Sequence, residues 1–371
     1  MLFRSTIQAE AKRLHVELPT GDDQQGLISL PLPQVSVVDM RLELVKGNRS
    51  VFSLELQQAL RTTLEANQQA MLFLNRKGTS TYVFCRECGY VVKCPRDDKP
   101  LIYHASRKAL LCHTCGYSRQ LPTKCPDCHG SQIRQLGTGT EKLADLVQEL
   151  LPGARVLRWD ADTTSQKGAH DLILSHFSAH RADILVGTQM LAKGLDLPLV
   201  TLVGIILAEV GLNLPDYRAA ERTFQVLTQV AGRAGRSPLG GRVIMQTYTP
   251  ENYAIQAASR QDYAGFYARE LQYRQELAYP PFTRLVKLEY RHANNERAEA
   301  TAQQMAESLK TRIKEGCLTQ TDFIGPVPCF YTRLNGQYRW QIILRGPDPA
   351  QLLHGRVLRD WLIEVDPPDL L

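Results

Sequence analysis

Seven of the nine cysteines in this 371-residue chain fall between Cys85 and Cys128, and they restrict the fold more than any other feature. Cys94 stands alone, and the other six form three C-x-x-C pairs: Cys85 with Cys88, Cys112 with Cys115, and Cys125 with Cys128. This spacing lets a tight turn direct two thiolates at one ion, and zinc takes four such ligands in a tetrahedron. The block has no long apolar run with which to build a core. We therefore expect a zinc-binding insertion at 85–128 whose folding depends on the metal.

The ligand count leaves one position open. Two four-ligand sites need eight ligands, and the block has seven cysteines. The segment Cys94-Pro95-Arg96-Asp97 has the spacing of a fourth pair, and a carboxylate can bind zinc, although more weakly than a thiolate in such a site. His104, His113 or His129 could take this position instead, or the second site could be lost. Closed sites leave no room for water or substrate, so we expect structural zinc.

The composition is that of an ordinary globular protein, with 43% hydrophobic and 22% charged residues. No run approaches the ~20 apolar residues of a membrane helix, and the first residues lack the apolar core of a secretory signal. These features predict a cytoplasmic, reducing location, where cysteines serve better as metal ligands than as disulfides. The net charge of +6 permits a polyanionic partner such as DNA without requiring one.

Strand and helix patterns alternate after Gly137 and indicate a parallel, doubly wound α/β sheet. We expect strands at 156–159, 184–187, 201–206 and 242–246, and helices at 141–151, 168–179 and 218–231. A helix at 54–69 and a buried strand at 70–74 precede the cysteines. We assign 54–84 and 129–279 to one lobe, interrupted by the insertion, and treat 1–53 as a connector with a strand or two.

The end of the chain has a different pattern, which starts after Tyr279-Pro280-Pro281-Phe282. It reads strand, helix, two strands, helix and strand, at 285–290, 296–314, 323–327, 337–344, 350–361 and 362–365. This order is that of a split βαβ, ferredoxin-like unit, so we expect an α+β domain at 280–371. Packing is the expected role of Arg339 and Trp340, ahead of base stacking, and of Cys317 and Cys329.

The first segment with phosphate-binding character is the loop at 187–198, directly after a predicted strand. Its candidate contacts are Gly187, Thr188, Lys193, Gly194 and Asp196. Ligands of α/β proteins bind at the carboxyl ends of parallel strands, and small residues there let backbone amides approach a phosphate. Alone, such a loop is equally compatible with an ordinary glycine-rich turn.

The second segment, Gln-Val-Ala-Gly-Arg-Ala-Gly-Arg at 229–236, provides candidate catalytic residues Gln229, Arg233 and Arg236. The arginines are three residues apart, so both guanidinium groups can face one γ-phosphate. A solvated basic turn explains this segment equally well when it is taken alone. The two segments in this order are far more specific.

Together they resemble motifs V and VI of superfamily-two helicases. Further segments narrow the resemblance: Phe-Leu-Asn-Arg-Lys-Gly at 73–78, Gly-Thr-Gly-Thr-Glu at 137–141, Asp-Ala-Asp-Thr-Thr at 160–164 and Leu-Asn-Leu-Pro-Asp-Tyr-Arg at 212–218. With the cysteine block, they resemble the PriA family of replication-restart helicases (primosomal protein N′) over residues 35–371. The resemblance implies a RecA-like second helicase lobe with an inserted zinc domain and a C-terminal domain similar to ribosomal protein S10.

The resemblance also implies an activity and partners. These are ATP-driven 3′-to-5′ unwinding of forked or single-stranded DNA, and contact with primosome proteins and single-strand-binding protein. It further implies two nested zinc sites, one from Cys85, Cys88, Cys125 and Cys128, the other from Cys94, Cys112 and Cys115 with position 97. Asp97 stands where the family has cysteine, and Glu209 where it usually has aspartate.

The sequence contains no G-x-x-x-x-G-K-[ST] loop and no Asp-Glu pair after a strand that could hold Mg²⁺. We therefore expect ATP and Mg²⁺ to bind only when a first motor lobe is supplied, whether the chain comes from a split gene, from a truncated gene model, or from a subunit that pairs with a separate polypeptide. The chain alone should lack useful ATPase activity. The alternatives are an ATPase-inactive zinc- and DNA-binding primosome scaffold, or a remnant without activity.

Overall fold

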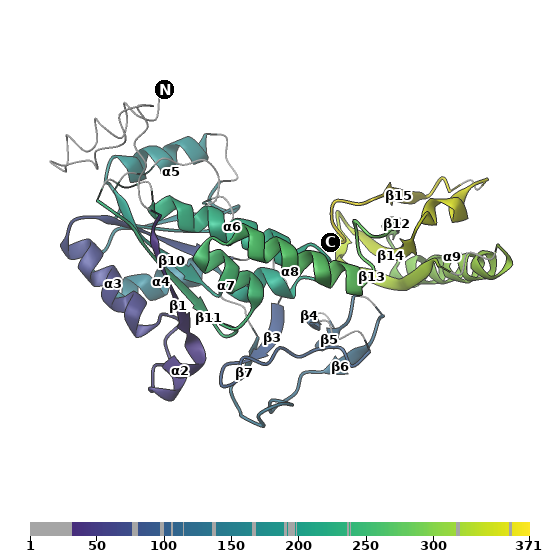
Figure 1. Ribbon diagram of the computed structural model, residues 1–371, viewed down its shortest axis with the longest axis horizontal. Coiled ribbons are helices and arrows are strands. Elements are labelled where there is room, and N and C mark those ends of the chain that lie inside the picture. Colours follow the sequence, from purple (N-terminus) through teal and green to yellow (C-terminus); the bar gives the residue numbers. More distant parts are fainter. Residues whose placement is uncertain are drawn as a thin grey trace.

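The computed structural model describes residues 32–75, 81–96, 100–104, 107–113, 115–135, 139–164, 168–188, 191, 197, 199–235, 237, 239–316, 320–355 and 358–371. The molecule is elongated, with an α/β lobe at one end, a small sheet with its own helix at the other, and the cysteine-rich region beside the junction (Figure 1). Within these ranges, no helix has the length and apolar character needed to cross a membrane.

A six-stranded sheet forms the lobe, in the order β1-β11-β10-β2-β9-β8. All five neighbouring pairs are parallel. The strands are β1 (Gln34–Asp39), β2 (Gln69–Leu74), β8 (Val156–Trp159), β9 (Ile184–Gly187), β10 (Val200–Ile206) and β11 (Arg242–Thr247). β2, β9 and β10 are buried along their whole length, as strands covered on both faces are. The predicted parallel α/β sheet is confirmed.

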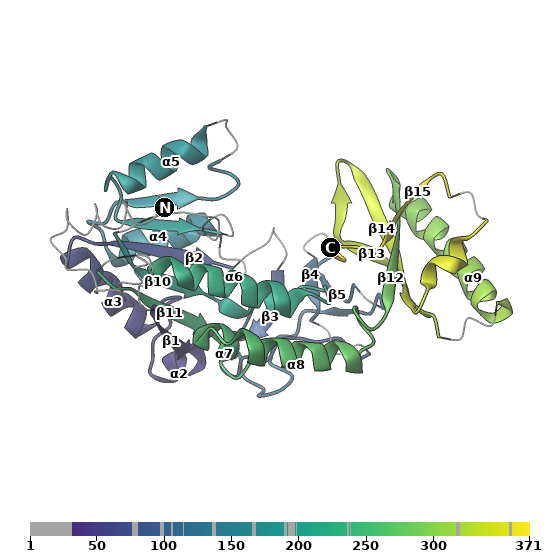
Figure 2. The same ribbon diagram turned by 45° about the horizontal axis from the view of Figure 1, so that its top comes forward.

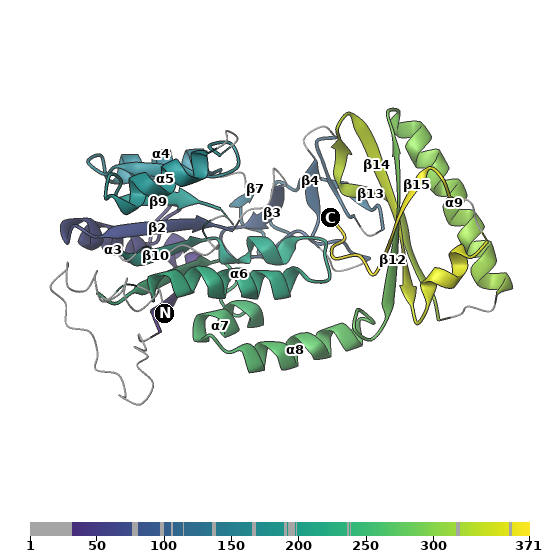
Figure 3. The ribbon, with the colours of Figure 1, turned by 90° about the horizontal axis from the view of Figure 1, so that it is seen from above.

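Helices cover both faces of this sheet. One face packs against α2 (Met40–Val45), α3 (Leu54–Glu65) and α4 (Thr140–Leu150). The other packs against α5 (Ala169–Ser178), α6 (Ala219–Ala234) and α7 (Tyr253–Arg260). The 3₁₀ helix η2 (Ala208–Asn213) leads into α6, and α8 (Tyr263–Glu276) follows α7. Figure 3 shows α6, α7 and α8 along one side of the molecule.

The segment expected as a connector belongs to the sheet. β1 is an edge strand that pairs in parallel with β11 over its whole length. Val38 and Met40 then pack into the lobe core. In the structure the lobe therefore includes residues from Gln34 onward, ahead of residue 54, where the sequence pattern predicted its start.

The cysteine-rich region contains an antiparallel sheet in the order β6-β5-β4-β3-β7. Its strands are β3 (Thr81–Cys85), β4 (Ile102–His104), β5 (Ala109–Leu111), β6 (Ser118–Gln120) and β7 (Ile133–Gln135). They extend slightly beyond the predicted 85–128. The small core of this region has nine buried residues, of which four are cysteines: Cys85, Cys94, Cys112 and Cys125. So much of the core is sulfur that its packing depends on what the sulfurs bind.

The C-terminal unit is a four-stranded antiparallel sheet in the order β13-β14-β12-β15, the arrangement of a split βαβ fold. Its elements are β12 (Arg284–His292), α9 (Asn295–Glu315), β13 (Asp322–Leu334), β14 (Gln337–Gly346), η3 (Pro349–Leu353) and β15 (Trp361–Val365). α9 covers one face of this sheet (Figure 2). The helix predicted at 350–361 was wrong: it is only the 3₁₀ turn η3, and Gly355 follows with φ of +73°, which helical backbone does not adopt.

One apolar cluster joins all three units. Phe330 on β13 and Leu371 pack in the same cluster as Tyr248, which follows β11, and Phe84 on β3. The rings of Phe84 and Tyr248 are 4.8 Å apart. The segment after β15 also returns to the lobe, where Arg222 on α6 donates to the carbonyl of Pro368. The C-terminal unit therefore shares a core with the lobe.

Candidate metal centres and helicase motifs

The first cysteine cluster consists of Cys85, Cys88, Cys125 and Cys128, whose four Sγ atoms lie within 4.8 Å of one another. The Sγ atoms of Cys85 and Cys128 are 3.7 Å apart, and so are those of Cys88 and Cys125. Four sulfurs bound to one zinc at 2.3 Å in a tetrahedron would be separated by about 3.8 Å. Burial raises the pKa of the Cys85 and Cys88 thiols, so a cation is needed to hold both as thiolates at neutral pH. The donor set and its geometry fit zinc.

The second cluster brings together Cys94, Cys112 and Cys115, again with sulfurs within 4.8 Å. The Sγ atoms of Cys94 and Cys115 are 3.5 Å apart. Asp97 lies outside the described residues, so its role as the fourth ligand stays a prediction. Among the residues that the structure describes, no histidine joins either cluster.

All three C-x-x-C turns share one backbone pattern. The residue after the second cysteine has positive φ, at +80° for Gly89, +74° for Gly116 and +60° for His129, and its N–H donates to the carbonyl of the first cysteine. Glycine adopts this conformation freely, whereas a side chain makes it costly. The turns that direct the sulfurs inward are therefore encoded by local sequence.

The first cluster is attached to the α/β lobe through Tyr248. Gly89 approaches this residue so closely that an added Cβ would lie 2.2 Å from the Tyr248 carbonyl oxygen. Arg86, between the two cysteines of the turn, donates from Nε to the Tyr248 hydroxyl at 2.9 Å. Glu209 on η2 accepts the Tyr248 N–H at 3.1 Å, so this buried acidic residue has a structural role. The sequence offered no signal for this contact.

The second cluster is attached to the C-terminal unit through β13. The side chain of His113, which follows Cys112, donates from Nδ1 to the Pro328 carbonyl at 3.0 Å and meets the Phe330 ring edge-on at 5.7 Å. His104 Nε2 and His113 Nε2 are 2.9 Å apart, and because His113 Nδ1 donates, His104 is the donor of this pair. Both histidines, which were candidate ligands, therefore serve the contact between the two units.

A buried charged cluster supports β13 from within the C-terminal unit. Glu289 accepts two hydrogen bonds of 2.7 Å from Arg339 and one of 2.6 Å from Arg291. Burial raises the pKa of Glu289, but these hydrogen bonds outweigh it and lower that pKa to about 2. Arg339 also donates to the Tyr331 carbonyl on β13 at 3.3 Å. This arginine is thus a packing residue, as expected.

The loop after β9 is only partly described. Gly187 is buried, and a Cβ there would lie 2.5 Å from the carbonyl oxygen of Trp159, so strand packing alone demands glycine. Thr188 follows it, half-buried. Lys193, Gly194 and Asp196 lie outside the described residues, and phosphate contact by this loop stays a prediction.

The predicted catalytic residues lie at the end of α6. Gln229 is exposed, Arg233 is only 8% exposed, and Arg236 lies outside the described residues. The guanidinium of Arg233 is thus largely enclosed, and an open approach from Arg233 and Arg236 to a triphosphate stays a prediction. Leu191 and Leu197, from the loop after β9, pack in the same apolar cluster as α6. The two motifs are therefore neighbours on one face of the sheet.

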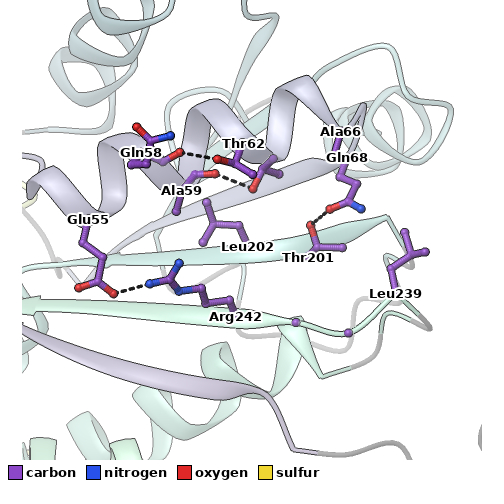
Figure 4. A pocket seen from close by; sticks show the side chains of 13 residues that line it. Glu55, Gln58, Ala59, Thr62, Ala66, Gln68, Thr201, Leu202, Leu239 and Arg242 are labelled. Atoms are coloured by element: carbon purple, nitrogen blue, oxygen red, sulfur yellow. Dashed lines mark hydrogen bonds and ion pairs between the residues drawn. The ribbon is translucent and has the colours of Figure 1, made fainter.

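A separate pocket of about 690 Å³ lies between α3 and the amino ends of β10 and β11 (Figure 4). Arg242 donates to Glu55 at 2.7 Å, and Thr201 donates to Gln68 at 2.6 Å. Arg242, the cation in the pocket lining, is therefore paired with Glu55. The pocket lining includes none of the described residues that were predicted to bind nucleotide. This pocket has no phosphate-binding character.

Three family models match the chain in order. They are the PriA DNA helicase Cys-rich region domain at 94–120, the helicase conserved C-terminal domain at 127–238, and the primosomal protein N C-terminal domain at 275–368. The chain belongs to the PriA family. The α/β lobe is thus the second helicase lobe of a PriA-type protein, and the cluster of Cys94, Cys112 and Cys115 lies within the matched Cys-rich region.

Curated relatives agree. Replication restart protein PriA of Bacillus subtilis is 45% identical over 337 residues, 90% of this chain and 41% of that protein. The Synechocystis protein of the same name is 44% identical, over 92% of this chain and 40% of its own length. The PriA protein of Haemophilus influenzae is 34% identical, over 90% of this chain and 46% of its own length. The chain thus spans less than half the length of the PriA proteins it matches.

Proposed function

We propose that this chain provides the second motor lobe, the zinc region and the C-terminal domain of an ATP-dependent replication-restart DNA helicase. The single observation that carries the proposal is the match of three consecutive PriA-type or helicase domains along one chain. The DNA is forked or single-stranded, and unwinding runs 3′ to 5′. Primosome proteins and single-strand-binding protein are the protein partners, in the cytoplasm.

Nucleotide hydrolysis in this proposal needs two lobes. Arg233 and Arg236 stabilise the charge that develops on a γ-phosphate, Gln229 precedes them in the same motif, and the loop from Gly187 to Asp196 approaches the phosphates. Leu191 and Leu197, which pack in the same apolar cluster as α6, support their joint action. The P-loop and the Mg²⁺ ligands must come from a first lobe, because this sequence has neither.

Two structural zinc ions are proposed for the cysteine-rich region. The first is held by Cys85, Cys88, Cys125 and Cys128, and the second by Cys94, Cys112, Cys115 and Asp97. The sulfur separations support both groups of cysteines. The metal supplies folding energy and leaves the chemistry of ATP to the motor lobes.

A second candidate function is that of an ATPase-inactive zinc- and DNA-binding primosome scaffold. The enclosure of Arg233 favours it, because an arginine that acts on a phosphate must reach that phosphate. This candidate predicts salt-sensitive binding to forked DNA by the chain alone.

The test measures ATP hydrolysis and fork unwinding by the chain alone and with a polypeptide carrying the P-loop lobe of a PriA protein. Only the mixture should be active, and Arg236→Ala should lower its kcat by about 10³-fold or more. Arg155→Ala is the matched control, because Arg155 pairs with Asp183 at the lobe surface, away from the motifs. A mixture that binds forks but never hydrolyses ATP would favour the scaffold.

A further inference from the structure

The two cysteine clusters differ in the ligands they offer. The first supplies four thiolates, and the described part of the second supplies three. The fourth C-x-x-C position of the second cluster is Asp97 in the sequence. Zinc is held less tightly when a hard carboxylate replaces a soft thiolate. The second ion is therefore the easier one to lose.

The clusters also differ in what they hold in place. The turn of the first cluster contacts the motor lobe at Tyr248. Residues next to the second cluster contact β13: His113 follows Cys112 and donates to the Pro328 carbonyl, and a Cβ on Gly116, which follows Cys115, would lie 3.8 Å from Val327. A change at the second cluster alone would therefore act first on its contact with β13, while the contacts of Gly89 and Arg86 with Tyr248 stay in place.

The second cluster can be reached by small solutes. Cys115 lines a cleft of about 1210 Å³ between the cysteine-rich region, the end of α8 and the C-terminal domain. Its Sγ lies 3.5 Å from that of Cys94, so a movement of about 1.5 Å would bring them to the 2.05 Å of a disulfide bond. Exposure does not explain why the second cluster should react first, because Cys115 is only half-buried whereas Cys128 of the first cluster is exposed. The two clusters differ in their fourth ligand and in the part of the molecule that they contact.

We propose that the second cluster is an oxidant-sensitive zinc joint that controls how the C-terminal domain is seated on the cysteine-rich region. The proposal rests on zinc binding as proposed above. Hydrogen peroxide oxidises one thiolate to a sulfenic acid, and the second thiolate displaces hydroxide to form the Cys94–Cys115 disulfide. The two sulfurs lose two electrons, peroxide takes these with two protons and leaves as two waters, and Zn²⁺ is released. A thiol reductant and zinc restore the joint.

The test follows zinc and structure in the full chain during a hydrogen peroxide titration. A chromogenic chelator counts released zinc, and mass spectrometry after alkylation identifies the oxidised cysteines. We expect one zinc to leave at a peroxide dose at least about tenfold below the second, with oxidation confined to Cys94, Cys112 and Cys115. Hydrogen exchange should rise in residues 327–334 of β13 and stay unchanged in residues 242–248.

Two variants make the test decisive. Asp97→Cys should complete a four-thiolate site and remove the difference between the two release doses. Cys128→Asp should weaken the first site instead, so that release begins there and exchange rises at 242–248. This mirror variant keeps the proposal falsifiable should Asp97→Cys disturb folding.

Three outcomes would overturn the proposal. These are simultaneous release of both ions, first oxidation at Cys85, Cys88, Cys125 or Cys128, and unchanged exchange of β13 after the first ion has left. A reduced chain that binds fewer than two zinc ions when zinc is supplied would overturn it at the first step. None of these readouts involves ATP, so failure of the motor proposal would be seen separately.

Discussion

The two cysteine clusters are built from the same turn and differ in what surrounds it. The turns at Gly89 and Gly116 have nearly the same φ, of +80° and +74°. Yet Gly89 is pressed against the Tyr248 carbonyl, whereas an added Cβ on Gly116 would meet its nearest neighbour, Val327, at 3.8 Å. A C-x-x-C motif thus specifies a local conformation, and the identity of the fourth ligand and of the neighbouring unit decides what the bound ion stabilises.

The largest effect is expected from Cys125→Ser. This side chain is 1% exposed and belongs to the four-thiolate cluster, so its loss should leave about one zinc per chain. We expect the free energy of unfolding to fall by roughly 5 kcal/mol, a part of the ~10–16 kcal/mol that structural zinc can supply. Metal analysis and thermal unfolding measure both quantities. Cys112→Ser should also remove one zinc but destabilise less, and equal losses would contradict the distinction between the clusters.

Glu289→Gln tests the buried charged cluster that supports β13, the strand that the second cysteine cluster contacts. It leaves Arg339 and Lys287 buried without their counter-ion and should cost about 3–5 kcal/mol in chemical denaturation. Because the pKa of Glu289 is lowered to about 2, the wild-type contribution is complete above the unfolded pKa of about 4.3 and is lost as pH falls toward 2.

Zinc thiolates take up protons at milder acidity, so acid should release zinc before it disrupts this charged cluster. Hydrogen exchange along β12 and β14, measured beside zinc content at decreasing pH, checks the order. Loss of exchange protection in β12 and β14 at a higher pH than zinc release would show that the charged cluster is the more acid-sensitive of the two.

Substitution of Gly89 and of Gly116 compares more directly the contact of the first cluster with Tyr248 and the contact of the second cluster with β13. Gly89→Ala adds a Cβ that would lie 2.2 Å from the Tyr248 carbonyl oxygen, so the backbone must move. We expect a loss of about 3 kcal/mol, made up of the clash and the left-handed backbone conformation. Gly116→Ala carries the conformational cost alone, about 1–2 kcal/mol. Equal losses of unfolding free energy for the two variants would mean that the contact between Gly89 and Tyr248 is looser than the structure indicates.

The smallest effect is expected from Tyr248→Phe. The variant keeps the ring contact with Phe84 and removes the hydroxyl that accepts from Arg86. Arg86 still donates to the carbonyls of Arg49 and Ser50, so the loss should be only about 0.5–1.5 kcal/mol. A zinc content below that of the wild type would show that this hydroxyl has a role in forming the first cluster.

Local patterns predicted much of this molecule. The alternation after Gly137 predicted the parallel sheet, and C-x-x-C spacing predicted which sulfurs turn inward, because both depend on neighbouring residues. The helices at 253–276 were not predicted, and that at 350–361 was wrong. α8 owes little to an apolar face, since Phe266 and Glu270 are its only buried residues.

The contacts of the two cysteine clusters with the lobe and with β13 could not be predicted. Arg86 and Tyr248 are 162 residues apart, and His113 and Pro328 are 215 apart. No local pattern relates residues at such separations. The enclosure of Arg233 likewise depends on tertiary packing, which a motif does not describe.

The shared cluster around Phe330, Leu371 and Tyr248 has a consequence for modularity. Cutting the gene at the apparent boundary near Tyr279 would leave an apolar cavity on the helicase side and expose two large side chains on the other. Exchange of the C-terminal domain between homologues would therefore require matched substitutions near Tyr248, so these parts should be inherited together.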